Sequence, residues 1–388
     1  LGTPSISVAS GATLDLLQGD VLYWTAGKAA LTINGGTVTQ SLTGYRQTIA
    51  NTLNMTGGTL TSAGVGDGNG NYSFYGVGIT ATSDASGNAA LVSANKISLQ
   101  SLTGFNLNVS RGAASPASDL TISSAIVDWS TAAGGTVTKS GAGILTLTGS
   151  NTYTGTTTLT GGTTIISGGG LANGGTLSVG SGAAATLTLS GTVGTVATSG
   201  YIQVGINASG VGTVNVNAGT LQSANDVNIG TASAGAGNTL TVAGGTLAVG
   251  NRLIIADTNT SGNVVTLSSG TITAVGGVVF GGGGAGANSV GTFNLDGGTL
   301  SPSYNSGFGG NISRYSSSGT YVFNFNGGTL KPAASTTELL AYSGSGSSQS
   351  GGTGVTYYVK SGGAIIDTSN GNVATAAALL AAPDSVRV

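Results

Sequence analysis

Apolar and polar residues alternate in seven short segments of the chain, and each segment ends in Gly followed by Thr. If that Thr is position zero, apolar residues occupy positions −6, −4 and +1 in all seven copies, with polar or small residues between them. The seven residues at position zero are Thr37, Thr59, Thr220, Thr246, Thr271, Thr299 and Thr329. This alternation with a period of two is typical of a strand with one buried face. The Gly before each Thr predicts a sharp turn into a second strand.

The spacing of the copies predicts how these strands are arranged. The last five copies follow one another after 26, 25, 28 and 30 residues. A period of this length, made of short strands and turns, indicates one coil of a parallel β-helix. A single coil cannot bury its apolar face alone, so successive coils stack into one core. We therefore expect an all-β, right-handed parallel β-helix (β-solenoid), a single elongated column with irregular loops over residues 1–388.

Aligning the copies also predicts which side chains meet. Apolar residues recur at positions +7 and +9, and with the earlier positions they predict an inward-facing ladder of ten residues. Its members are Leu240, Val242, Leu247, Leu253 and Ile255, stacked on Val265, Leu267, Ile272, Val278 and Phe280. At position +6, Asp226 aligns with Arg252, so we expect a cross-coil ion pair on an exposed face that contributes at most about 1 kcal/mol.

Two stretches depart from the repeat. Residues 64–90 interrupt it and are interpreted as an irregular loop or coil insertion. Tyr72, Phe74 and Tyr75 within them could form a binding loop that stacks on sugar rings or docks a neighbour, or they could cap an exposed end of the core. Near the C-terminus, residues 374–384 form a possible short cap segment, with helix and strand both open.

Composition narrows the class of protein. The chain has 72 Gly among 388 residues, 39% hydrophobic residues, 6% charged residues and a net charge of −2. The apolar content argues against disorder, and the lack of a basic patch argues against a nucleic-acid partner. There is no Cys for a disulfide framework, and no apolar run reaches the length of a transmembrane helix.

Candidate chemistry is sparse. The chain has no His, and its twelve acidic residues are scattered. In the coils that can be aligned, no two acids fall at equivalent positions of neighbouring turns, whereas glycoside hydrolysis needs two carboxyl groups about 5–10 Å apart. The segment Asp67–Asn71 lacks the Gly and Glu that an EF-hand requires at its sixth and twelfth positions. We predict no catalytic, cofactor or metal site, and we expect that the chain is not an enzyme.

One phrase resembles a known family. Residues 138–163 read TKSGAGILTLTGSNTYTGTTTLTGGT, which resembles the passenger-associated repeat of bacterial autotransporters, also called the autotransporter-associated β-strand repeat. Residues 57–64 and 359–372 resemble looser repeats of the same group. The resemblance implies a right-handed β-helix exported to the cell surface. The start at Leu1 is interpreted as that of a processed or excerpted segment.

These features predict an extracellular or bacterial cell-surface protein that forms a stiff rod or fibre. β-prone segments at both ends and a low net charge favour end-to-end association of the chain with itself. The alternative for these ends is that they are interior coils of a longer rod. An adhesin-like module that binds glycans or a surface is the second hypothesis for function, and a polysaccharide-active β-helix enzyme is the third.

Overall fold

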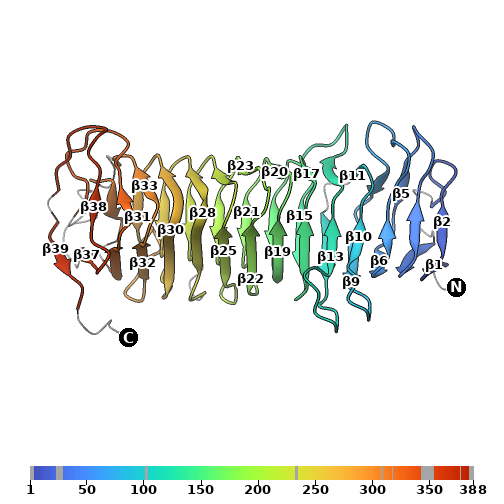
Figure 1. The fold of residues 1–388 in the computed structure, drawn as a ribbon, viewed down its shortest axis with the longest axis horizontal. Coiled ribbons are helices and arrows are strands. Elements are labelled where there is room, and N and C mark those ends of the chain that lie inside the picture. The colour runs from blue at the N-terminus through green and yellow to red at the C-terminus, as the bar shows by residue number, and fades with distance from the viewer. Residues whose placement is uncertain are drawn as a thin grey trace. The chain divides into compact units, whose positions relative to one another are not determined.

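The computed structural model describes residues 4–22, 29–100, 104–231, 235–305, 307, 309–316, 318–341, 354–375 and 377–383. Over these ranges the fold is all-β, and the named strands pair in parallel as the stacked coils of a β-solenoid (Figure 1). The chain divides into two compact units, described separately below. Unit 1 comprises Leu1–Leu177 and Thr186–Val196, and unit 2 comprises Ser178–Ala185 and Ala197–Val388.

Unit 1 is built from three parallel ladders of short strands. Ladder 1A contains β1 (Ser5–Ala9), β3 (Ala30–Asn34), β6 (Leu53–Thr56), β9 (Ile79–Thr82), β12 (Phe105–Val109), β15 (Val137–Ser140) and β18 (Thr157–Leu159). Ladder 1B contains β2 (Thr13–Asp15), β4 (Thr37–Thr39), β7 (Thr59–Leu60), β10 (Ala90–Val92), β13 (Leu120–Ile122), β16 (Ile144–Leu147) and β19 (Gly162–Ile166). Ladder 1C contains β5 (Gln47–Ile49), β8 (Tyr72–Phe74), β11 (Lys96–Leu99) and β14 (Ala125–Asp128), and β17 (Ser150–Asn151) pairs with β20 (Gly170–Asn173). Three strands per coil let three sheets enclose one apolar core.

Unit 2 repeats this plan, and two of its strands are 11 and 12 residues long. Ladder 2A contains β24 (Ile202–Val204), β27 (Val227–Ile229), β29 (Leu253–Ile255), β31 (Val278–Phe280) and β34 (Ile312–Arg314). The remaining strands are β25 (Gly212–Val216), β26 (Thr220–Ser223), β28 (Thr239–Val249), β30 (Asn263–Ala274), β32 (Val290–Leu295), β33 (Thr299–Pro302), β35 (Thr320–Phe325), β36 (Thr329–Leu330), β37 (Val355–Val359), β38 (Ile365–Ile366) and β39 (Leu379–Ala381). Strands β21 (Leu177–Val179), β22 (Ala185–Leu189) and β23 (Thr195–Thr198) span the division between the units in sequence.

The core of unit 2 consists of like residues stacked in register. Each of the ten residues of the expected ladder has 0% exposed surface. The register places Leu240 beside Val265, Val242 beside Leu267, Leu247 beside Ile272, Leu253 beside Val278, and Ile255 beside Phe280. These are the pairs that the alignment of the copies predicts.

The segment 64–90 is more regular than the sequence indicates. It contains β8 and β9, which pair with strands of the neighbouring coils. The interpretation as a continuous irregular insertion is therefore wrong for residues 72–74 and 79–82, and turns remain on either side of these strands. These two strands are three and four residues long.

The C-terminal segment contains a strand where helix and strand were both open. β39 pairs with β37, and all three residues of β39 are exposed. Residues 376 and 384 lie outside the described ranges. No helix in the described part of the chain has the length and apolar character needed to cross a membrane.

Candidate functional site

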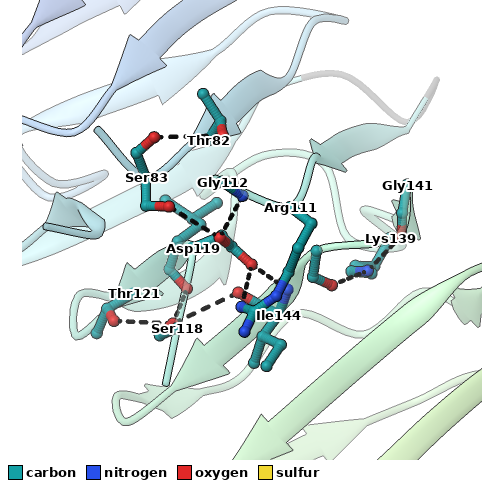
Figure 2. A network of polar contacts seen from close by, with 12 residues as sticks. Thr82, Ser83, Arg111, Gly112, Ser118, Asp119, Thr121, Lys139, Gly141 and Ile144 are labelled. Carbon is teal, nitrogen blue, oxygen red and sulfur yellow. Dashed lines mark hydrogen bonds and ion pairs between the residues drawn. The ribbon is translucent and has the colours of Figure 1, made fainter. Parts of the chain in front are cut away.

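A buried carboxylate joins neighbouring coils of unit 1. Asp119 lies directly before β13, and its side chain is completely buried. It accepts hydrogen bonds from the Ser83 hydroxyl at 3.0 Å, the Gly112 amide at 2.9 Å and the Ile144 amide at 2.8 Å (Figure 2). The Arg111 guanidinium forms an ion pair with it at 2.8 Å. These partners follow β9 and β12 and begin β16, so one side chain connects three successive coils.

The electrostatics of Asp119 favour its charged form. Burial disfavours a carboxylate, but the amides of Gly112 and Ile144, the Arg111 guanidinium and the Ser83 hydroxyl lower its pKa below the ordinary value. Hydrogen bonds to an ionised acceptor are stronger than those between neutral groups. Asp119 is therefore an anionic link between coils.

A buried lysine lies close to this carboxylate. Lys139 is in β15, at an inward position whose neighbours in the ladder are Leu107 and Leu159, and it has 0% exposed surface. Its ammonium group donates to the carbonyl oxygens of Gly141 and Gly143 at 2.7 Å each and of Gly161 at 2.6 Å. Figure 2 shows the Lys139 amine turned toward Gly141. Burial lowers the pKa of Lys139 to about 8, while the negative charge of Asp119 acts in the opposite direction.

Gly residues around Lys139 leave space that a Cβ atom would fill. Gly162 has a φ of +63°, and a Cβ atom there would lie 2.4 Å from the Lys139 amine and 2.5 Å from the Gly143 carbonyl oxygen. Gly141 has a φ of +77°, a conformation that residues with a Cβ atom rarely adopt. The Gly residues of this phrase thus let the backbone carbonyls approach one ammonium group.

Of the three aromatics considered for a binding loop or for a cap of the core, two lie in the core. Tyr72 and Phe74 lie in β8 and are 0% and 2% exposed, whereas Tyr75 is 54% exposed. The Tyr72 hydroxyl donates to the Thr61 carbonyl, and the Phe74 ring contacts the Phe105 ring with centroids 4.7 Å apart. The prediction of three aromatics available to a ligand is wrong for Tyr72 and Phe74, because alternation within β8 places both side chains in the core.

Asp226 and Arg252 lie together on adjacent coils of unit 2. Arg252 Nη2 is 2.6 Å and Nε is 3.1 Å from the two carboxylate oxygens, and the Arg252 amide donates to the same carboxylate at 2.9 Å. The Asp226 side chain is only 6% exposed and that of Arg252 is 29% exposed. The expected exposed face is therefore wrong for Asp226, whose carboxylate is buried against the Arg252 amide and guanidinium.

Sequence reasoning did not select Asp119 or Lys139. A signal was present for Lys139, since Val137 and Lys139 alternate with Thr138 and Ser140, and this alternation places position 139 on the inward side of β15. Asp119 precedes a short apolar strand and gave no such signal. Its four partners are 7–36 residues away in sequence.

Carboxylates in the described residues serve mainly as acceptors for turns. Asp128 accepts from the Gly135 amide at 2.9 Å and from the Thr154 amide and hydroxyl at 3.0 and 2.5 Å. No group of three or more His, Cys, Asp or Glu residues that could hold a metal ion occurs among the residues described. These carboxylates therefore link turns of neighbouring coils through hydrogen bonds.

Fold and site together define a repeat protein of the β-solenoid class, whose buried polar groups link consecutive coils. Residues 137–166 match the passenger-associated-transport-repeat family. The match begins with the first residue of β15 and ends with the last residue of β19, and it includes Lys139 and the glycines around it. Comparison with curated proteins and comparison with solved structures each gave no match.

Proposed function

We propose that this chain is a segment of an exported bacterial passenger and that its solenoid is a structural scaffold presented outside the cell. The observation that supports this proposal is the coincidence of the passenger-associated-transport-repeat match with the strands β15 to β19. A stack of parallel coils satisfies its backbone groups from coil to coil, which makes such a fold resistant to local opening.

The proposed role is non-catalytic. Support comes from the way in which the acidic residues are used: Asp119, Asp128 and Asp226 each accept several hydrogen bonds from turns or from an arginine. A carboxylate held by several donors in this way is committed to its structural partners. The use of these carboxylates as structural acceptors supports a scaffold role.

The location can be tested with antibodies raised against the purified chain. We expect intact cells of the source bacterium to be labelled and external protease to reduce the labelling. Labelling that appears only after the cells are permeabilised would contradict the proposed location.

The scaffold is further proposed to associate end to end. Strand β1 pairs with β3, and β39 pairs with β37. Leu379 and Leu380 in β39 are 43% and 46% exposed. An unpaired strand edge can bind another strand, and two unlike edges that pair form a heterologous contact that propagates into filaments. The same edges would be continuous with neighbouring coils if the chain were part of a longer rod.

Sedimentation of the purified chain over a range of concentrations tests this association. We expect the particles to lengthen with concentration and removal of residues 1–12 to prevent it. Replacing Ser5 and Ser7 of β1 with Lys should weaken association, whereas Lys at Ser86 and Ala113, in exposed turns of unit 1, should not. A chain that stays monomeric at high concentration would contradict the proposal.

A groove in unit 2 supports the adhesin-like alternative. It has a volume of about 480 Å³ and is lined by Gly235, Ala236, Asn259, Thr260, Ser261, Ala287, Asn288 and Val290. Uncharged amide and hydroxyl groups suit the hydroxyls of a neutral glycan. A glycan array tests this function. Binding that is lost in Asn288→Ala would favour the adhesin-like alternative, and an array without binding would contradict it.

A further inference from the structure

Three backbone carbonyl oxygens converge on one point inside unit 1. Gly141 and Gly143 lie in the turn between β15 and β16, and Gly161 lies in the turn before β19. Their oxygens are 2.6–2.7 Å from the Lys139 amine. These distances are those of charge-assisted hydrogen bonds, and the three donors of an ammonium group match the three acceptors.

The site offers acceptors to an ammonium group, while burial acts against its charge and lowers the pKa of Lys139. Carbonyl oxygens can only accept, and the nearby Asp119 carboxylate adds to the negative potential. The Gly143 oxygen also accepts from the Thr163 amide, at a longer distance of 3.3 Å. A neutral apolar side chain in place of Lys139 would leave one buried and two half-buried acceptors without their strongest partner, which is costly in a low dielectric.

We propose that the carbonyls of Gly141, Gly143 and Gly161 form a binding site for an ammonium-type monovalent cation, which the chain fills from within by the side chain of Lys139. The aliphatic part of Lys139 passes between Leu107 and Leu159 in ladder 1A. Shortening the side chain to Ala would therefore leave an enclosed apolar channel that ends in three carbonyl oxygens. A small alkylammonium ion has the shape and the donors to occupy it. This inference does not depend on the proposed function.

Lys139→Ala tests the site through chemical rescue. We expect the full chain with this change to unfold at a lower temperature than the wild type. Ethylammonium chloride should raise its midpoint saturably, whereas tetramethylammonium chloride at equal ionic strength should not, because that ion has no N–H donor. The wild type should respond equally to both salts.

Lys96→Ala is the matched control. The Lys96 amine donates to a single carbonyl, that of Gly68, at the surface, so its removal creates no enclosed site and should give no selective response to ethylammonium. Equal responses to the two salts in Lys139→Ala, or none, would overturn the proposal.

Refolding decides the matter if Lys139→Ala does not fold in sodium chloride. Recovery of the native circular dichroism spectrum in ethylammonium chloride, but not in tetramethylammonium chloride, would support the site. Failure to recover in both salts would overturn it.

Discussion

Two charged side chains lie in the interior of unit 1, and backbone groups supply most of their partners. Asp119 accepts hydrogen bonds from two backbone amides, and Lys139 donates hydrogen bonds to three backbone carbonyls. Backbone amides at the turns thus bind an anionic side chain, and backbone carbonyls at the turns bind a cationic one. A buried charge is tolerated when its hydrogen-bonding capacity is met in this way.

Replacing Asp119 by Ala should lower the free energy of unfolding by about 3–5 kcal/mol, because Arg111 and two buried amides lose their acceptor. Asp84→Ala is the control, since the Asp84 carboxylate accepts from Ser86 and Asn88 within its own exposed turn. That change should cost much less, because it removes only contacts within one exposed turn. Guanidinium unfolding of both variants checks this, and equal losses would show that Asp119 does not join coils.

The pKa of Lys139 predicts a dependence on alkaline pH. The unfolded amine keeps its proton up to the ordinary lysine pKa of 10.5, whereas the folded amine, with its lowered pKa, releases it near pH 8. Because the unfolded state then binds more protons, the free energy of unfolding should rise between these two pH values. It should do so relative to Lys139→Met, which lacks the titrating group.

The comparison with Lys139→Met is needed because buried tyrosines act in the opposite direction. Burial raises the pKa of Tyr153, so its contribution is present below pH 10 and is lost as the pH rises through the raised value. Denaturant unfolding of both proteins from pH 7 to 10.5 measures the difference. A constant difference would contradict the lowered pKa of Lys139.

Gly162→Ala should be more destabilising than Gly182→Ala. Both residues have positive φ, +63° and +88°, but a Cβ atom at Gly182 would meet nothing within 4 Å. The shared backbone strain costs about 1 kcal/mol, and Gly162→Ala should lose a further 1–3 kcal/mol by displacing the Lys139 amine and crowding the Gly143 carbonyl oxygen. Thermal unfolding of the pair checks this, and equal losses would indicate that the amine can move without cost.

At the scale of elements, one sequence phrase produces two kinds of corner. Around Thr37 the −6 and −4 residues lie in β3 of ladder 1A, and the +1 residue lies in β4 of ladder 1B. Around Thr246 and Thr271 the whole phrase lies within one strand, β28 or β30, with a register irregularity after Val242. The phrase specifies two apolar-facing stretches and a bend between them, and the surrounding coil determines whether the strand continues through the bend.

The sequence predicts the pairs of core residues on neighbouring coils, but it predicts neither the strand at residues 72–74 nor the contacts around Lys139. Alternation gave the core pairs such as Val242 with Leu267, because repeated coils stack identical positions. Residues 72–74 lie between stretches that contain Gly and Asn, and on sequence alone these residues favour a loop. The three carbonyl oxygens around the Lys139 amine could not be predicted from the sequence, because they belong to two turns that come together only in the folded chain.

Leu267→Asp should be severely destabilising, by about 3–5 kcal/mol or more, because an unpaired charge would enter the core. Leu267 has 0% exposed surface and stacks between Val242 and Leu295. The control is Thr266→Asp, which changes the neighbouring half-buried outward position. Thermal midpoints within a degree or so of each other would contradict the register of β30.

At the scale of the whole molecule, the fold follows from repetition and not from charge or cross-links. The chain has only 22 charged residues and no Cys. Stability must therefore come from the apolar ladders and from the hydrogen bonds that run from coil to coil. The same low charge offers little repulsion between chains, in agreement with the proposed association.

The absence of Cys allows the central claim, that like positions of consecutive coils are stacked in register, to be measured by disulfide formation. Thr241 and Thr266 are register partners, whereas Val264 is the partner of Thr239. Neighbouring strands are about 4.8 Å apart, and a disulfide requires Cα atoms within about 7 Å. Oxidation of Thr241→Cys/Thr266→Cys should give a cross-link detectable by mass spectrometry, and Thr241→Cys/Val264→Cys should give little. Equal yields from the two pairs, or a higher yield from the second, would contradict the stacked register.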